Sequence, residues 1–230
     1  MRERPSNILE ALVAARDEPA SEFTDDDVVG NVATMLFAGE DTTANAMAWL
    51  LYFLAITPDA AQCAAAEAGA VLGESRTLAD YAALERLRYI EAAAVESMRL
   101  KPIAPVQGHA CNVELNLAGL VVPPGTMLFL LPRVAATDAA HFDDPFAFRP
   151  ERFLGEQGSD DARHKLFPFG GGPRFCPGRY LAMVEMRMVV AMALRNFGFS
   201  LDLSADAVQE HFTMTLGPKA LPLRLTPRER

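Results

Sequence analysis

One cysteine of the chain has surroundings that suit metal chemistry. Cys176 lies in the loop Phe169–Gly178, whose sequence FGGGPRFCPG contains four of the fifteen glycines and two of the sixteen prolines. That density excludes a helix or a regular strand, and three successive glycines let a flat or bulky group approach the backbone closely. An apolar run from about Arg179 to Asn196 predicts a helix directly after the loop. A cysteine just before a helix N-terminus is favoured as the thiolate, which is the form that binds metal.

A lone thiolate does not make a zinc site, and the sequence offers it no partners. Cys63 and Cys111 are far from Cys176 along the chain, which has no C-x-x-C or H-x-x-H pair. Arg174 adds a planar guanidinium, whose N–H groups can donate two parallel hydrogen bonds to a carboxylate. These features fit a planar cofactor with ligands of its own, such as haem, which carries propionates and takes one axial ligand from the protein. The residues alone leave the alternative open, an inert thiol in a buried glycine-rich loop.

A second polar group stands inside a long apolar stretch. Thr24, followed by three aspartates, predicts a helix start, and nothing interrupts the pattern before Thr57-Pro58. This helix would be roughly 45 Å long, and its apolar character on nearly all sides predicts a central, buried helix. Asp41 and Thr42 place a carboxylate and a hydroxyl within this otherwise apolar helix. The structural alternative is that Thr42 bonds to a carbonyl one turn earlier and Gly39 eases helix packing.

A third motif, Glu96-x-x-Arg99, lies in the predicted helix Leu87–Leu100. Residues at i and i+3 share a helix face and can pair. On a surface such a pair contributes only a few tenths of a kcal/mol, so from the residues alone it is ordinary.

Together these motifs resemble a known family. The loop matches F-x-x-G-x-R-x-C-x-G throughout, which is similar to the haem-binding signature of the cytochrome P-450 family of haem-thiolate monooxygenases. The stretch Ala38-Gly39-Glu40-Asp41-Thr42-Thr43 resembles that family's oxygen-activation motif. Glu96-x-x-Arg99 and Phe148–Phe153 resemble its E-x-x-R and F-x-P-x-R-F segments, and all four follow in the family's order.

The resemblance implies roles for individual residues. Cys176 would be the axial ligand of haem b, and other cofactor-binding residues would be Phe169, Arg174, Gly178, Ala38 and, on a propionate, His109. Asp41 and Thr42 would deliver protons from a locally opened part of the long helix. Glu96 and Arg99 would pair in the interior with Arg152 as structural residues. Ala104, Val106 and Met214 would line the pocket of an apolar substrate.

The fold class that the resemblance implies is mainly α with small antiparallel β-sheets. We expect residues 1–230 to form the C-terminal, haem-ligating part of a single cytochrome P-450 domain, because family members begin well before the equivalent of Met1. The missing N-terminal half would carry helices that cover the central helix. We therefore expect the fragment alone not to turn over substrate.

Further elements follow from local patterns. Ser6–Arg16 and Pro58–Gly73 are predicted helices, and Gly198 is predicted to close the helix after Cys176. Apolar alternation predicts strands at Val113–Leu117, Leu120–Val122, Met127–Leu131, Phe199–Leu203, Phe212–Leu216 and Leu221–Leu225. Gly155–Arg163 is predicted to be an exposed, mobile loop.

Composition limits location and partners. A formal net charge of −9 argues against a nucleic-acid partner. Three cysteines without framework spacing indicate a reducing compartment, so we expect a cytoplasmic protein. No signal peptide is visible, and the longest apolar run, Ala44–Ile56, is too short to span a membrane and contains Asn45.

The function expected from the resemblance is insertion of one oxygen atom from O₂ into a small apolar substrate. Electrons would come from a ferredoxin or a flavoprotein reductase, docked on basic residues around the loop: Arg163, Lys165, Arg174, Arg179 and Arg187. One alternative is a peroxide-using haem-thiolate relative, although such relatives commonly lack the acid–alcohol pair. Another is a truncated haem-binding remnant without turnover.

Overall fold

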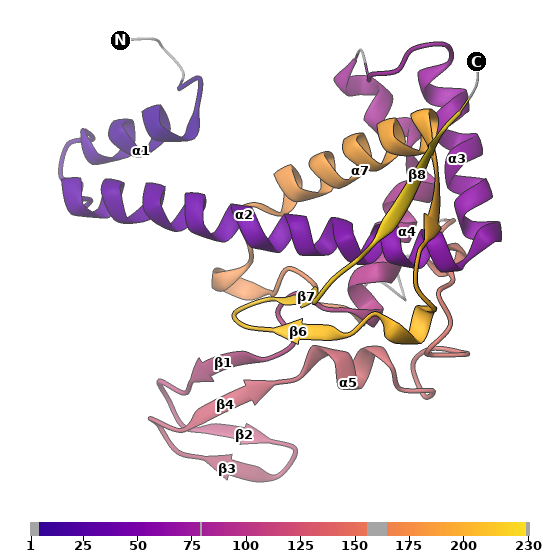
Figure 1. Ribbon diagram of the computed structural model, residues 1–230. Helices are drawn as coiled ribbons and strands as arrows, with labels where there is room; N and C mark the ends of the chain where they lie inside the picture. Colours follow the sequence, from indigo (N-terminus) through magenta and orange to yellow (C-terminus); the bar gives the residue numbers. More distant parts are fainter. Residues whose placement is uncertain (1–4, 79, 156–164, 229–230) are drawn as a thin grey trace. The chain divides into compact units, whose positions relative to one another are not determined.

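The computed structural model describes residues 5–78, 80–155 and 165–228, and it separates into two compact units. The first unit is Met1–Thr42 and the second is Thr43–Arg230. Helices dominate the described residues, and the strands among them form four two-stranded antiparallel sheets (Figure 1). The predicted fold class, mainly α with small antiparallel sheets, is confirmed.

The first unit contains α1 (Ile8–Arg16) and the start of α2 (Asp25–Ile56). The predicted cap of α2 is present, because Thr24 Oγ1 accepts from the Asp27 N–H at 3.2 Å and the Asp27 carboxylate accepts from the Thr24 N–H at 2.8 Å. The prediction that this helix is buried throughout is wrong for this part. Leu36 and Phe37 are 73% and 66% exposed.

Helices of the second unit surround one core. They are α3 (Pro58–Leu72), α4 (Arg88–Leu100), α5 (Pro132–Ala136) and α7 (Arg179–Asn196), with short 3₁₀ turns η1 (Tyr81–Arg86), η2 (Pro150–Phe153), η3 (Gly172–Arg174) and η4 (Ala205–Ala207). The helices α3, α4 and α7 pack against one another. Every described α4 residue from Ala92 to Leu100 is buried. In the described helices, none combines the length and apolar character needed to cross a bilayer.

The start of α4 is fixed by a side chain from another helix. The carboxylate of Glu67 on α3 accepts hydrogen bonds from the backbone N–H groups of Tyr89 (2.7 Å) and Ile90 (2.9 Å). These N–H groups belong to the first turn, which has no partner within its own helix. The cap therefore orients α4, which carries Glu96 and Arg99, against α3.

The strands pair as short antiparallel ribbons. The pairs are β1 (Gln107–Ala110) with β4 (Met127–Leu130), β2 (Leu115–Leu117) with β3 (Leu120–Val122), β5 (Phe197–Leu201) with β8 (Leu223–Pro227), and β6 (Glu210–Phe212) with β7 (Leu216–Pro218). The register of the last pair places Phe212 opposite Leu216 and His211 opposite Gly217.

Two local predictions need correction. Phe212–Leu216 is not one strand: its ends lie in β6 and β7, and Thr213–Thr215 is the turn between them. Gly198 does not close α7, which ends at Asn196, but lies inside β5. Pro132 begins α5, because proline is well tolerated at the first helical position. The predicted loop Gly155–Arg163 lies almost wholly outside the described residues.

Gly217 provides a test of the packing between α2 and the β6–β7 hairpin. A Cβ at Gly217 would lie 2.6 Å from the Asn45 Cγ atom on α2, too close for real atoms. We expect Gly217→Ala to lower the free energy of unfolding by about 1–3 kcal/mol through overpacking. Urea unfolding followed by circular dichroism would measure the change.

The matched control is Gly69→Ala in the interior of α3, where a Cβ meets nothing within 4 Å. There alanine should stabilise the protein by about 0.5–1 kcal/mol. Equal effects of the two substitutions would show that the hairpin does not pack on Asn45 as described.

Candidate cofactor site

The loop before α7 is held in place by its own backbone. The N–H of Cys176 donates to the carbonyl of Phe169 (2.8 Å), and the N–H of Phe175 donates to that of Gly172 (3.2 Å). Gly170 and Gly172 adopt φ angles of +69° and +62°, which side chains disfavour. Glycine is therefore required at these two positions for the loop to fold back and present Cys176.

The thiol of Cys176 lies at the N-terminal end of α7. The carbonyl of Cys176 accepts from the Arg179 N–H (3.3 Å), and that of Gly178 accepts from the Ala182 N–H (2.9 Å), which starts the helix. Gly178 brings no side chain to cap the first N–H groups, and a Cβ there would lie 3.7 Å from Cys176 Sγ. The thiol is half-buried and not in a disulfide. A negative charge on this sulfur faces the positive end of the helix dipole.

The surroundings of this thiol fit a flat, apolar ligand that carries carboxylates. Phe175 and Leu181, on either side of Cys176 in sequence, are 53% and 62% exposed, whereas Phe169 packs against the core. Arg174 is exposed, and among the described residues its guanidinium has no hydrogen-bond or ion-pair partner. In the described chain no group of three or more His, Cys, Asp or Glu residues is placed to hold a metal ion. The donor set thus matches haem, which needs one axial ligand and a cation for its propionates.

The structure brings Glu96, Arg99 and Arg152 together in the interior. Arg99 Nε and Nη2 donate to the two oxygens of Glu96 at 2.6 and 2.9 Å, and both side chains are 0% exposed. Arg152 Nε, from η2, lies 3.3 Å from Glu96 Oε1, which also accepts from the backbone N–H of Arg149 at 2.9 Å. Their role as structural residues remains a prediction, but the geometry is that of a fully bonded buried ion cluster.

Other partners of Arg99 could not be found from the sequence. Its Nη1 donates to the carbonyls of Ala136 (2.6 Å) and Pro145 (2.7 Å), and its Nη2 to that of Ala147 (3.2 Å). The guanidinium also lies 4.9 Å from the ring centroid of Phe142. One arginine therefore connects α4 to the end of α5 and to the segment before η2. Backbone acceptors carry no residue-type signal, which is why motif reading missed them.

Asp41 and Thr42 end the first unit, whereas Cys176 belongs to the second. The hydroxyl of Thr42 donates to the carbonyl of Ala38 at 2.6 Å, which is the bond that the structural alternative requires. Asp41 is exposed. The local opening expected here does not interrupt the helix, because α2 is continuous from Asp25 to Ile56.

Residues expected at the substrate and propionate sites lie on neighbouring segments. His109 is exposed in β1, opposite Leu128. Ala104 and Val106 precede β1, and Met214 is 72% exposed in the turn between β6 and β7. The N–H of Leu216 donates to the carbonyl of Ile103 at 2.9 Å, so the hairpin is bonded to the segment that leads to Ala104.

The hairpin is also anchored by charge at its other strand. Glu210 in β6 pairs with Arg133 (2.9 Å) and with Lys101. Burial raises the pKa of the Glu210 carboxyl, but hydrogen bonds from Arg133 and Lys101 outweigh this, so its pKa lies below the usual value. The carboxylate therefore stays charged at neutral pH.

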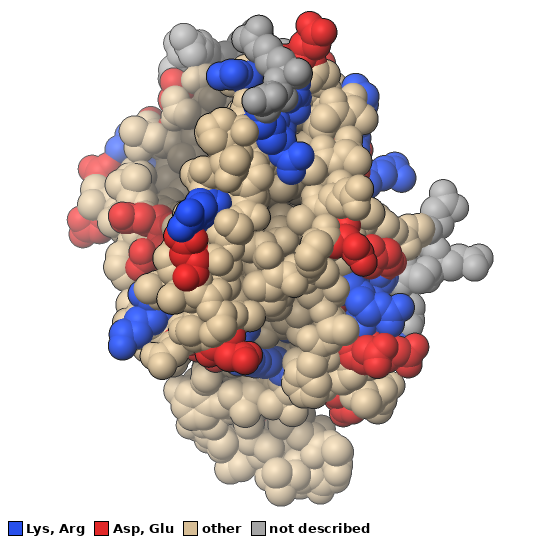
Figure 2. Space-filling view, turned by 45° about the vertical axis from the view of Figure 1, so that its right-hand side comes forward, with Lys and Arg blue, Asp and Glu red and all other residues tan. Residues whose placement is uncertain are grey.

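Of the five basic residues expected to form a docking surface, the structure removes one, Arg187, from that surface. Arg187 pairs with Glu91 (3.2 Å) and donates to the carbonyls of Met183 and Leu84, so it is a largely buried structural residue. Arg163 lies outside the described residues, whereas Arg174 and Arg179 are exposed. Acidic and basic side chains are interspersed on the face drawn in Figure 2, where broad areas carry neither.

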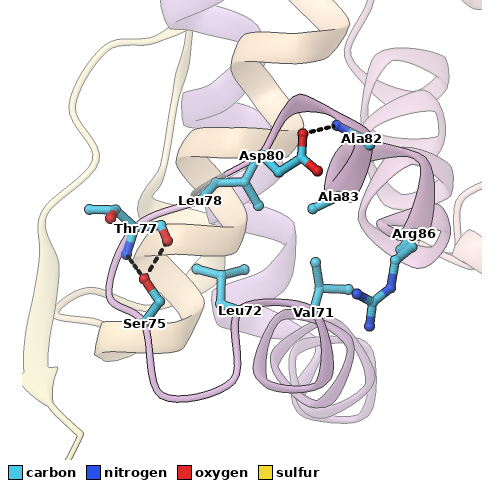
Figure 3. Close-up of a pocket in the computed structure, with 9 residues that line it drawn as sticks. All are labelled: Val71, Leu72, Ser75, Thr77, Leu78, Asp80, Ala82, Ala83 and Arg86. Carbon is cyan, nitrogen blue, oxygen red and sulfur yellow. Dashed lines mark hydrogen bonds between the residues drawn. The ribbon is translucent and has the colours of Figure 1, made fainter.

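A separate hollow of about 320 Å³ lies between the end of α3 and η1 (Figure 3). Its polar side chains are occupied locally: Asp80 accepts from the Ala82 N–H and Ser75 donates to the Thr77 carbonyl. None of the site residues predicted from sequence lines it.

Comparison with known proteins identifies the family. The sequence model of the family "Cytochrome P450" matches residues 1–225. The chain is 32% identical over 189 residues to human cytochrome P450 4V2, covering 82% of this chain and 36% of that protein. It is 33% identical over 198 residues to cytochrome P450 93G1 of rice, Oryza sativa subsp. japonica, covering 83% of this chain and 38% of that protein.

A solved structure agrees with the sequence matches. The crystal structure of the cytochrome P450 CYP102L1 superposes with a TM-score of 0.85 at 30% identity, covering 99% of this chain and 52% of that one. The chain belongs to the cytochrome P450 family, as its motifs indicated, and members of this family bind haem. It spans little more than a third of the length of the curated relatives it matches.

The buried ion cluster predicts a large cost for removing its negative charge. Glu96→Gln keeps the shape of the side chain but leaves Arg99 without a counter-charge, which should cost about 3–5 kcal/mol of stability. Urea unfolding would measure the loss. The control is Asp202→Asn, which weakens the exposed pair of Asp202 with Arg224 and should cost below about 1 kcal/mol. If the two substitutions cost the same, Glu96 does not sit in a dry, charge-balanced cluster.

Proposed function

We propose that this chain provides the haem-thiolate part of a monooxygenase that inserts one oxygen atom from O₂ into a small apolar substrate. The observation that carries the proposal is the geometry of Cys176, a half-buried thiol at the start of α7 in a glycine loop that bonds to itself. The family match supports the reaction class. The cofactor proposed is haem b.

The chain's own residues have distinct tasks in this proposal. Cys176 would hold the haem iron through its thiolate, whose electron density would suit the iron to oxygen chemistry. The guanidinium of Arg174 would pair with a propionate, and Phe169, Gly178 and His109 would provide further cofactor contacts. Ala38 is a cofactor-binding residue that the family resemblance implies. When bound, haem supplies the iron that activates dioxygen. The loop needs the clearance that its glycines provide, because a cofactor face must approach the sulfur.

Asp41 and Thr42 are proposed to move protons. Cleavage of an O–O bond consumes protons in a place from which water is excluded, so a polar relay must be part of the protein. The Thr42 hydroxyl now donates to the Ala38 carbonyl. Its lone pairs can still accept a proton, and rotation away from Ala38 frees it to donate onward.

The proposal extends to partners and location. The electron donor would be a ferredoxin or a flavoprotein reductase, for which exposed Arg174 and Arg179 offer positive charge near the thiolate loop. Ala104, Val106 and Met214 would contact the substrate, and their small or apolar side chains suit an apolar one. A cytoplasmic location is proposed from the absence of a disulfide framework among the three cysteines.

Loss of the Cys176 thiol should abolish iron–sulfur ligation. In the haem-loaded protein, Cys176→Ala should lose the strongly red-shifted absorption band of the reduced carbon-monoxide complex, because that shift requires thiolate ligation of the iron. Cys63→Ala and Cys111→Ala are the controls and should keep the band, since neither residue lies in the loop. Retention of the band in Cys176→Ala would refute the proposed ligand.

Thr42→Ala should separate proton delivery from binding. In the full-length context that turnover requires, we expect substrate-induced spectral changes to persist, while product per electron pair falls about tenfold or more and hydrogen peroxide rises. The matched control is Thr34→Ala. Thr34 lies in the same helix, and its hydroxyl donates to the Gly30 carbonyl (2.7 Å) just as the Thr42 hydroxyl donates to the Ala38 carbonyl. Equal product yields from the Thr42 and Thr34 variants would leave Thr42 with only its helix bond.

A further inference from the structure

The turn between β6 and β7 is fixed to α2 by two side chains one helical turn apart. Asn45 Nδ2 donates to Thr215 Oγ1 at 2.9 Å, and Trp49 Nε1 donates to the Leu216 carbonyl at 3.0 Å. Trp49 is buried and Asn45 is half-buried. Both bonds reach residues at the end of the turn, where the chain enters β7.

Gly217 makes this approach possible. A side chain there would overlap the Asn45 amide, with a Cβ only 2.6 Å from Asn45 Cγ. The hairpin backbone therefore rests directly on the amide of Asn45. Because protein interiors are close-packed and not easily compressed, so close a contact restricts how far the hairpin backbone can move toward α2.

The remaining contacts hold the base of the hairpin and leave its tip exposed. Leu216 is bonded to Ile103, and Glu210 is paired with Arg133 and Lys101. Phe212 and Met214 are 52% and 72% exposed. The tip is thus an apolar surface on a rigid support, next to the segment that leads to Ala104.

We propose that Asn45, acting through Thr215, is a positioning residue that sets where the tip Phe212–Met214 lies and thereby which apolar substrates the protein accepts. This inference rests on the proposed function, in which Met214 contacts the substrate. Asn45 follows Asp41 by four residues in α2, so one helix would carry both the proton relay and the support of the substrate-facing hairpin.

Two substitutions remove the same bond from opposite sides. Asn45→Ala deletes the donor, and Thr215→Val deletes the acceptor while keeping the branched shape of the side chain. The control is Asn31→Ala on the same helix, because Asn31 is exposed and donates only to the Asp27 carbonyl among the described residues. The double variant Asn45→Ala/Thr215→Val tests whether the two residues act as one.

Hydrogen exchange measures the hairpin without requiring haem. Amide exchange in peptides covering 209–219 should rise about fivefold in each single variant, because a hydrogen bond contributes about 1 kcal/mol. The double variant should exchange no faster than the singles, and Asn31→Ala should match the unsubstituted chain. Additive effects, or no effect of Asn45→Ala, would overturn the proposal.

Ligand preference in the haem-loaded protein tests the consequence for specificity. The probes are 1-butylimidazole and 1-decylimidazole, whose binding is followed by absorbance. The ratio of their dissociation constants should change about threefold or more, equally in both single variants. An unchanged ratio would overturn the specificity claim. If the unsubstituted protein lacked the thiolate carbon-monoxide band, the proposed function would fail, and the exchange data would still decide whether Asn45 positions the hairpin.

Discussion

A buried carboxylate, that of Glu96, places the strictest demand on this structure. A charge without water must be balanced and hydrogen-bonded by the protein. The Glu96 carboxylate accepts hydrogen bonds from the Arg99 guanidinium and the Arg149 N–H, and it pairs with Arg152. The remaining N–H groups of Arg99 donate to backbone carbonyls near α5 and before η2. The hydrogen bonds that balance this carboxylate and its arginine thus fix α4 against the irregular segment between α5 and η2, which belongs to no sheet or long helix.

The thiolate loop depends on that arrangement through packing. The helix α7, which begins just after Cys176, packs against α3 and α4, and Phe153 and Phe169 belong to the same core. Glu67 fixes the other end of α4 through its first N–H groups. The position of the Cys176 sulfur therefore follows from a rigid helix group, while the loop itself supplies the backbone bonds and the two glycines with positive φ.

The features that were predicted well from the sequence depend on interactions between residues that are close along the chain. The glycine loop, the helix after it and the pairing of Glu96 with Arg99 depend on residues close in sequence. The exposure of Leu36 and Phe37 agrees with the expected absence of the helices that would cover the central helix, whereas the apolar pattern alone shows only which side chains favour burial. The alternation of Phe212–Leu216 favours a strand, yet contacts from α2 and Ile103 place a turn there. Arg187 shows the same limit, since its partner Glu91 is distant in sequence.

The most direct test of the account is to identify the atom that binds the iron. X-ray absorption at the iron edge of the haem-loaded protein should show one sulfur neighbour besides the nitrogens that haem itself supplies. That sulfur signal should be lost when Cys176 is replaced by serine and kept when Cys63 or Cys111 is replaced. An iron without a sulfur neighbour, or a sulfur signal that survives Cys176→Ser, would contradict the central claim that this loop provides a haem-thiolate ligand.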